Sequence, residues 1–460
     1  MATQRLATWT VSLQYTDLPK SVTQAAVRSF YNWAGCALGG SNHRTTTTAL
    51  EALAPFFGPA TSSILGRAAS KNDNSNNNVN NLPSRADASH AALINGIASH
   101  VHDYDDTHLE TIIHPTGPVA SALLAQAEAL GNVGGQQFIL ALVAGIEAEC
   151  KLGLAVWPKH YDVGWHITST TGSIGAAVAV GKILHLSEEQ MSHAIGIAAT
   201  QVTGLREMFG SDTKSFHVGR SAQNGLMAAI LASKGYTSSL QALEAKRGWA
   251  NVVSETQRLD DQISTLGQVW EIEKNSFKPF PCGIVVHPII DGCIQLHQDM
   301  KNKNLSPADI KAVHCRVHPL VLELTGKKTP QDGLQAKFSV YHGGAAGLVL
   351  GKAGPAQYDD NVVRSQDIIS VRDKIDAVAD DKLGADETEI VVEFSNGEKL
   401  TKHVTHAIGS LEVPMTDQQL EDKFIDQVTE ALGSQRASKA SQSCWTIGDA
   451  ASAGDLVRTL

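Results

Sequence analysis

The chain has 460 residues, a hydrophobic content of 42%, an aromatic content of only 5% and a formal net charge of −10. A chain of this length usually exceeds what one hydrophobic core holds, so we expect two domains. The acidic balance and the lack of a basic cluster argue against nucleic acid and anionic membranes as partners. An acidic protein can still bind an anionic substrate, but it then needs a local cationic pocket.

The cysteines and the N-terminal residues indicate the compartment. The N-terminal stretch MATQRLATWTVSLQYTDLP lacks the long apolar core of a signal peptide, and no apolar run reaches the roughly 18 residues of a membrane span. The six cysteines form neither a C-x-x-C pair nor a dense framework, which fits a reducing compartment: Cys36, Cys150, Cys282, Cys293, Cys315 and Cys444. We therefore expect a cytoplasmic protein, with the mitochondrial matrix as the second choice.

The first 270 residues predict helices that pack closely through small side chains. Residues 21–40 place apolar side chains on one face and end in a double glycine. A second helix is delimited by Pro118 and Gly131, and residues 136–153 are apolar nearly all round, which is typical of a central helix. Two capping-box patterns mark expected helix starts: Ser21-x-x-Gln24 and Ser187-x-x-Gln190.

Residues 70–81, SKNDNSNNNVNN, interrupt this helical region. They are polar and rich in asparagine, so they cannot bury enough apolar surface to order themselves. We interpret them as a surface-loop insertion without a catalytic role.

The pattern changes after about residue 270. Residues 313–318 alternate with the period of a strand, and residues 388–405 predict a hairpin around a type I′ turn at Asn396-Gly397. Between them, residues 367–380 have helical spacing. Beyond the hairpin, a capping box at Thr416 and Gln419 starts another helix. We expect a helical domain from residues 1–270 and 411–460, and an inserted α+β lid domain from residues 271–410.

The segment 100–115, HVHDYDDTHLETIIHP, holds four histidines and four acids. A metal site is one explanation, but Tyr104 stands where an H-x-H-x-D-H hydrolase motif needs an aspartate. The stretch DDTHLE also matches the D-D-x-x-E of terpene cyclases. Those enzymes shield carbocations with aromatic side chains and use a second magnesium motif, and this chain has few aromatic residues and no such motif. We expect no metal.

A solvated helix end is the simplest alternative for part of this segment. It would account for His100, His102, His108 and Glu110. It accounts less well for the other polar residues, which precede a turn and the helix start at Pro118, where acids and a histidine would meet a helix N-terminus: Asp103, Asp105, Asp106 and His114.

Four more glycine-rich turns carry polar groups next to expected helices. A single histidine or lysine in such a place is usually structural or merely exposed. Five turns of the same style, with segment 100–115 as the first, favour a shared pocket. The polar groups of the other four turns are His166, Lys214 with His217, Lys278 with His287, and Tyr341 with His342.

Six segments in order identify a resemblance to the MmgE/PrpD family. They are DYDDTH…HP, GWHITSTTGSIGAA, GSDTKSFHVGRSAQNGL, KPFPCGIVVHPIID, AKFSVYHGGAAG and VPMTDQQLEDKF, and the resemblance runs from about Leu6 to about Val428. The family includes 2-methylcitrate dehydratase, cis-aconitate decarboxylase and iminodisuccinate epimerase. The resemblance implies a large helical domain from both chain ends, an inserted α+β lid, a homodimer, and an active site in the cleft that needs neither metal nor organic cofactor.

The resemblance also implies site residues. As catalytic residues we expect Asp103, His114, His166, Lys214 and Tyr341, and as substrate-binding residues Thr107, Lys278 and His287. Each of them stands in one of the matching segments. One departure concerns Gly283, because some decarboxylases of the family have a histidine there, whereas the nearest histidine here is His287.

The same residues suit the chemistry without reference to the family. Lys214 and Lys278 can bind carboxylates from opposite domains, a histidine can remove a proton next to a carboxylate, and Asp103 can orient that histidine. The resulting intermediate can lose β-hydroxide or be reprotonated on its other face. Decarboxylation reaches a related carbanion by loss of CO₂ and then needs a proton donor.

We therefore expect a cofactor-independent lyase, either a dehydratase or a decarboxylase, that acts on a small di- or tricarboxylate. An epimerase of a dicarboxylate such as iminodisuccinate, with the same acid and base residues, is the first alternative. A non-catalytic dimeric helical scaffold is the second. The expected partners are the small polycarboxylate substrate and a second copy of the chain, without nucleic acid or membrane.

Overall fold

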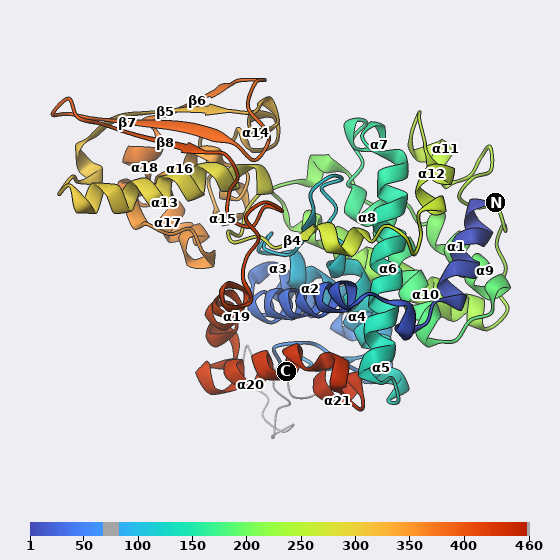
Figure 1. Ribbon diagram of the computed structural model, residues 1–460. Helices are drawn as coiled ribbons and strands as arrows, with labels where there is room; N and C mark the ends of the chain where they lie inside the picture. Colours follow the sequence, from blue (N-terminus) through green and yellow to red (C-terminus); the bar gives the residue numbers. More distant parts are fainter. Residues whose placement is uncertain (68–81, 458–460) are drawn as a thin grey trace.

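The structure is a computed structural model that describes residues 1–67 and 82–457. It consists of a large helical domain and a smaller α+β domain beside it (Figure 1). The helical domain is built from both chain ends and the α+β domain is inserted between them, so the predicted fold class is confirmed. The asparagine-rich segment 70–81, predicted to be a surface loop, lies outside the described residues.

The helical domain packs long buried helices around one main apolar core. No helix in the described ranges is both long and apolar enough to cross a membrane. The helices of the first part of the chain are α1 (Ala2–Ser12), α2 (Lys20–Gly39), α3 (Arg44–Leu53), α4 (Ala88–His100), α5 (Thr116–Leu130), α6 (Gly135–Val156), α7 (Lys159–Asp162), α8 (Ile167–Ile183), α9 (Glu188–Ala199), α10 (Asp212–Ser233), α11 (Trp249–Val253) and α12 (Leu259–Ser264). The C-terminal part adds α19 (Asp417–Leu432), α20 (Ser434–Trp445) and α21 (Ala453–Val457).

Most predicted helix boundaries are confirmed. Helix α5 ends at Leu130 with Gly131 in the left-handed region, at φ +78°. The capping box at Ser187 is present at the start of α9. The capping box predicted at Ser21 is wrong, because α2 begins at Lys20 without a side-chain cap. The carbonyl of Pro19 already accepts a hydrogen bond from the amide of Thr23, so proline, with its fixed φ, is the N-cap and the helix starts two residues earlier than predicted.

Small residues let α8 lie close to its neighbours, as expected from the alanine- and glycine-rich sequence. A Cβ atom added at Gly175 would lie 2.8 Å from the carbonyl oxygen of Gly145 on α6. A Cβ atom added at Gly225 on α10 would lie 2.5 Å from the carbonyl oxygen of Ser173. These contacts hold α6, α8 and α10 together, and the N-terminal ends of α8 and α10 carry His166 and Lys214.

The α+β domain is a four-stranded sheet with helices packed against it. The strand order is β6 (Ile375–Ala379), β5 (Ile310–Val317), β7 (Thr388–Phe394) and β8 (Lys399–Val404), and only the β5–β6 pair is parallel. Helices α13 (His287–Asn302) and α16 (Val340–Leu350) lie side by side beneath it and fill a second apolar core (Figure 1). The shorter helices are α14 (Pro319–Thr325), α15 (Gly333–Ala336), α17 (Asp360–Val363) and α18 (Gln366–Arg372).

Two local predictions in this domain need correction. The helix predicted from the spacing of residues 367–380 covers only α18, because Ile375–Ala379 pairs with β5 as an edge strand. The hairpin between β7 and β8 is present, but its turn is not type I′. Only Gly397 has a positive φ, at +88°, and the side chain of Asn396 accepts a hydrogen bond from the amide of Glu398 (2.9 Å). The local side-chain bond stabilises Asn396 in the ordinary region.

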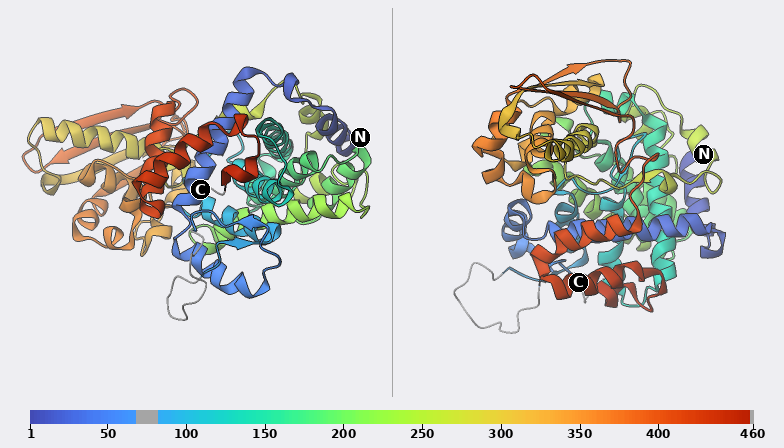
Figure 2. Two further views of the ribbon diagram at one scale, coloured as in Figure 1. Left: turned by 90° about the horizontal axis from the view of Figure 1, so that it is seen from below. Right: turned by 60° about the vertical axis from the view of Figure 1, so that its left-hand side comes forward.

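Two connections bring the domains together. Strand β3 (Thr107–His108) pairs with β4 (Asn275–Ser276), which leads into the α+β domain. After β8 the chain returns, and the predicted capping box at Thr416 starts α19, which packs against α2 of the helical domain (Figures 1 and 2). The first and last described helices, α1 and α21, therefore both belong to the helical domain. A further small ladder joins β1 (Ser62–Ser63) and β2 (Arg85–Ala86). The domain boundaries at residues 270 and 410 stay a prediction.

Candidate active site

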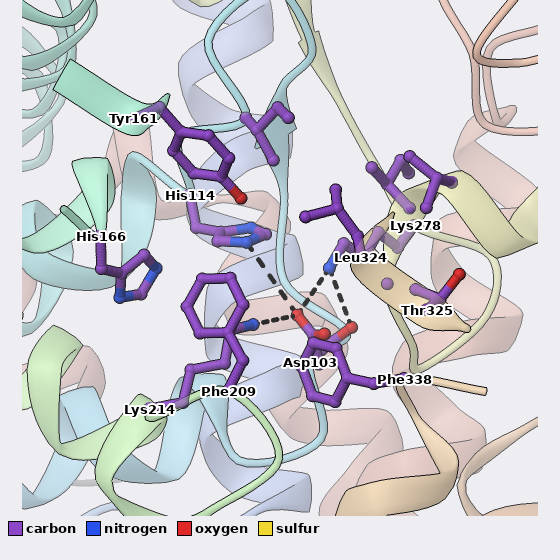
Figure 3. Close-up of a pocket in the computed structure, with 14 residues that line it drawn as sticks. Asp103, His114, Tyr161, His166, Phe209, Lys214, Lys278, Leu324, Thr325 and Phe338 are labelled. Carbon is purple, nitrogen blue, oxygen red and sulfur yellow. Dashed lines mark hydrogen bonds and ion pairs between the residues drawn. The ribbon is translucent and has the colours of Figure 1, made fainter. Parts of the chain in front are cut away.

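A pocket lies where the helical domain meets the α+β domain (Figure 3). Five of the eight predicted site residues line it, and they come from four separate turns of the chain. The rest of the wall is mostly apolar. The lining residues are Asp103, Ile112, His114, Tyr161, His166, Phe209, Lys214, Lys278, Gly283, Ile284, Val285, Leu324, Thr325 and Phe338.

Asp103 is the centre of the polar half of the pocket. Its Oδ1 atom accepts hydrogen bonds from the Nζ atoms of Lys214 (2.9 Å) and Lys278 (2.7 Å), and all three side chains are buried. Burial alone would raise the pKa of Asp103, but the two ammonium groups outweigh it and hold the pKa well below its usual range. Two ammonium groups and one carboxylate leave this cluster with a net positive charge.

His114 presents one ring nitrogen to the cluster. Its Nδ1 atom lies 2.8 Å from the carbonyl oxygen of Asp106, and since a carbonyl only accepts, Nδ1 carries the proton. Its Nε2 atom is therefore the basic nitrogen, and it lies 4.0 Å from Oδ1 of Asp103 (Figure 3). Burial and the charge of Lys278 lower the pKa of His114 to about 3. The ring is thus a neutral base near pH 7.

His166 faces the pocket from the start of α8. Its Nδ1 atom lies 3.0 Å from Nδ1 of His217 on α10, so one of these two nitrogens carries a proton and the other accepts it. Behind the pocket, His100 pairs with Asp105 (2.7 Å), and its ring lies 4.9 Å from that of His114. The histidines therefore form a buried cluster.

Burial controls the charge of many titratable groups. Among the described residues, three carboxyl groups have a pKa raised by burial: Asp106 to about 6, Glu147 to about 7, and Glu149 well above its usual value. Nine histidines have a pKa that burial lowers: His43, His100, His102, His114, His160, His166, His217, His287 and His342. The folded protein therefore holds more neutral histidines than neutral acids.

The sequence reasoning missed the aromatic side of the pocket. The hydroxyl of Tyr161 on α7 points toward His114, and burial raises the pKa of this phenol to about 12, so it stays protonated (Figure 3). Phe209 and Phe338 stack with a centroid distance of 5.8 Å, and the Nζ atom of Lys214 lies 5.2 and 5.3 Å from their rings. A tyrosine five residues before His166 is the only sequence signal for Tyr161, and it fits no motif that we used.

Three predicted residues do not line this pocket. Thr107 lies behind it, where its hydroxyl is 3.2 Å from Nδ1 of His114. His287 is buried at a neighbouring apolar cavity, and its ring forms a T-shaped contact with that of Phe280 at a centroid distance of 5.4 Å. Tyr341 belongs to the core of the α+β domain. Thr107 can act by holding His114, whereas nothing in the surroundings of Tyr341 suggests contact with a substrate.

The backbone near the pocket is unusual at two positions. Asp103 has φ +51°, which an aspartate tolerates, and Ile112 has φ +59°, which is costly for a β-branched side chain. Both residues line the pocket. The surrounding structure therefore holds the loop in a conformation that its own residues do not favour.

Four of the buried side chains could together reach one metal ion: His100, Asp103, Asp105 and His114. Their preferred partners are already present, because Asp103 binds two lysines and Asp105 binds His100. A divalent cation at this point would lie next to two ammonium groups, which is electrostatically unfavourable. The donor set therefore fits a metal ion poorly.

Fold and site together define the class of this protein. Residues 4–262 match the MmgE/PrpD N-terminal domain and residues 280–447 match the MmgE/PrpD C-terminal domain, so the chain belongs to the MmgE/PrpD family.

Three relatives are similar to this chain over different shares of its length. The cis-aconitate decarboxylase-like protein oryM of Aspergillus oryzae is 25% identical, over 99% of this chain and 96% of that protein. Human cis-aconitate decarboxylase is 27% identical, over 74% of this chain and 72% of that protein. The 2-methylcitrate dehydratase of Salmonella typhimurium is 24% identical, over 49% of this chain and 50% of that protein.

Proposed function

We propose that this protein is a lyase that acts on a small di- or tricarboxylate by proton transfer next to a carboxylate. The convergence of two lysines, one aspartate and two histidines in one pocket carries this proposal. It is supported by the names of the relatives, which are decarboxylases and a dehydratase. The proposed catalytic residues are Asp103, His114, His166 and Lys214, with Lys278 and Thr107 as binding and supporting residues.

The reaction first requires a cationic binding site for a substrate carboxylate. Lys214 comes from the helical domain, and Lys278 comes from the segment that enters the α+β domain, so a carboxylate between them contacts both sides of the junction. Both ammonium groups now share one oxygen of Asp103, and they can exchange part of that contact for a substrate oxygen. Charge-assisted bonds of this kind position the carbon that reacts.

The second requirement is a base next to that carbon. His114 is neutral, its Nδ1 proton is held by the carbonyl of Asp106, and its Nε2 lone pair faces the pocket. Removal of a proton by Nε2 places negative charge on the substrate carboxylate, which Lys214 and Lys278 stabilise. A bound anion also raises the pKa of His166 and His217, so that this pair can return a proton.

Two exits keep the reaction within the lyases. In dehydration, the β-hydroxyl group leaves with a proton from the His166 side, and the product is an alkene and water. In decarboxylation, a carbon–carbon bond breaks, CO₂ leaves, and the carbanion takes a proton from a histidine. We favour decarboxylation, because the decarboxylase-type relatives match nearly the whole chain or three quarters of it, whereas the dehydratase matches about half.

Epimerisation is the second candidate. It needs one group to remove a proton and another to return it on the opposite face, and His114 and His166 both line the pocket. Gly283 leaves the pocket wall without a side chain, next to Thr325, at the position where some decarboxylases of the family have a histidine. The resemblance thus implies one difference between the present site and those decarboxylases.

Proton NMR in D₂O with cis-aconitate, 2-methylcitrate and iminodisuccinate tests the proposal. Loss of CO₂ or water supports the lyase and identifies its exit. Deuterium exchange with inversion and no net loss supports the epimerase. A protein that leaves all three unchanged, although it is folded and dimeric, would support the scaffold alternative. Light scattering tests the expected homodimer in the same sample, since one chain has a mass of 48.9 kDa.

A further inference from the structure

Three consecutive carbonyl groups in the turn that carries Asp103 are each bound by a different buried lysine. The carbonyl oxygen of His102 accepts from Lys337 (2.8 Å), that of Asp103 from Lys278 (3.1 Å), and that of Tyr104 from Lys423 (2.7 Å). The three lysines come from different parts of the chain and are 1–6% exposed. Lys278 lines the catalytic pocket, whereas Lys337 and Lys423 do not.

Lys423 and Lys337 each hold a second segment as well. Lys423, on α19, also donates to the carbonyl of Lys278 (2.8 Å) and to the side-chain oxygen of Asn32 on α2 (2.7 Å). Lys337, which follows α15, also donates to the carbonyl of Pro281 (3.2 Å). Each of them therefore joins the Asp103 turn of the helical domain to residues 278–281, which lead into the α+β domain.

The cost of these side chains indicates that the arrangement is specific. Burial lowers the pKa of both Lys337 and Lys423 to about 8, so each ammonium group is held against a desolvation cost. The three N–H donors of Lys423 have three oxygen acceptors, and its ammonium group lies 3.9 Å from the ring centre of Tyr104. A buried polar network in which every donor has an acceptor defines one geometry, whereas a network with unsatisfied donors does not.

We propose that Lys337 and Lys423 are positioning residues, which set the distance between Asp103 and Lys278 across the domain junction without contact with the substrate. Asp103 adopts φ +51° there, and that turn directs its carbonyl groups toward the lysines. If either lysine is lost, the turn and residues 278–281 lose a shared anchor. The catalytic effect would pass through Lys278, and to that extent the inference rests on the proposed function.

Lys182 offers a matched control. On α8, its Nζ atom also donates to three oxygens, the carbonyls of Thr10 (2.7 Å), Val11 (2.9 Å) and Leu13 (2.7 Å), but these lie at the end of α1 and outside the pocket. Lys182→Met therefore removes a lysine that, like Lys423, donates three hydrogen bonds, at a position away from the pocket. A general loss of stability would affect all three lysine variants, whereas a loss of positioning would affect only two.

The experiment compares Lys423→Met, Lys337→Met and Lys182→Met by hydrogen exchange and by steady-state kinetics. We expect faster exchange of the peptides that cover residues 101–108 and 275–282 in the first two variants and not in the third. We expect kcat to fall by about tenfold or more in those two, a lost-positioning effect, with Lys182→Met within about twofold of the wild type. Wild-type exchange in both peptides would overturn the proposal.

A double-mutant cycle with Lys278→Ala separates positioning from destabilisation. If Lys423 acts through Lys278, the Lys423→Met change should lower kcat much less in the Lys278→Ala background. Equal losses in both backgrounds would overturn the proposal. If the Met variants do not fold, Lys423→Arg keeps the charge but cannot send three donors from one nitrogen, and wild-type exchange and kcat in this variant would equally overturn the proposal. Should the wild-type protein turn over no polycarboxylate, the proposed function fails, and hydrogen exchange still decides the positioning role.

Discussion

His114→Gln is the substitution that most directly tests the proposed chemistry. Glutamine has nearly the reach of histidine, and its amide can still donate to the carbonyl of Asp106, so the loop should keep its conformation. What is lost is the basic Nε2 atom, 4.0 Å from Asp103. Loss of a general base costs roughly 10²- to 10⁴-fold in turnover, or about 3 to 5 kcal/mol of barrier.

His108→Gln is the matched control in the same loop. His108 is as buried as His114, but its ring bonds to Thr111 (2.7 Å) and Glu271 (3.2 Å) and does not line the pocket. Glu271 keeps its ion pairs with Lys151 and Lys274 after the change. We expect a loss of about 1 to 3 kcal/mol in the free energy of unfolding, typical of a broken buried hydrogen bond, with little change in kcat.

The assay measures kcat and KM with the substrate that NMR identifies, and the melting temperature of both variants. The expected result is a folded, nearly inactive His114→Gln and a less stable, active His108→Gln. A His114→Gln enzyme within a few-fold of wild-type turnover would refute the role of His114. So would an inactive His108→Gln variant with unchanged folding, because the base would then lie on the other side of the loop.

Three other measurements test the site. Lys214→Met should chiefly raise KM if Lys214 only binds a carboxylate, and should lower kcat if it stabilises the intermediate; an unchanged kcat/KM would contradict both roles. Activity should survive dialysis against EDTA, and one tightly bound metal ion per chain that is lost together with activity would contradict the metal-free site. The free energy of unfolding should fall as the pH drops from about 7 to 4, since nine buried histidines have lowered pKa values and only three acids have raised ones. The unfolded chain then binds more protons than the folded one, and each excess proton lowers the free energy of unfolding by roughly 1.4 kcal/mol per pH unit. Urea titrations in which stability rises as the pH drops from about 7 to 4 would contradict this expectation.

Glycine-rich turns beside helices allowed much of the site to be predicted from the sequence. His166 and Lys214 lie at the starts of α8 and α10, which pack closely through glycine and alanine, and both residues line the pocket. Asp103 and His114 share one loop, so their proximity was expected as well. The same style of reasoning placed Tyr341 in the pocket, yet its side chain lies in the core of the α+β domain. A turn pattern indicates where the backbone passes, and the direction of one side chain depends on the packing around it.

The residues that were not predicted have ordinary local sequences. Lys423 lies in LEDKF on an amphipathic helix, where a lysine usually faces solvent, and it is buried only because α2, the Asp103 turn and residues 278–281 meet over it. Lys337 and Phe338 follow a helix of four residues and lie in AKFSVYHGGAAG, a segment that carries the family resemblance but did not indicate a role for either side chain. Such positions depend on contacts between segments hundreds of residues apart, and periodicity within one segment does not contain that information.

The lysines and histidines of the pocket have opposing effects that a bound substrate would link. Lys278 and Lys214 are among the groups that depress the pKa of His114, and Lys214 is the chief charge that depresses that of His166. A substrate carboxylate between these lysines would offset their charge, and the proton affinity of both histidines would then rise. In the free site the two histidines are thus neutral and can accept a proton. In the occupied site their higher proton affinity also lets them remain protonated. This change suits both a reaction in which a histidine removes a proton from the substrate and a decarboxylation in which a histidine donates one to the carbanion. It requires the lysines to stay within a few ångströms of Asp103. The same requirement gives a reason for the two further lysines that anchor the Asp103 turn.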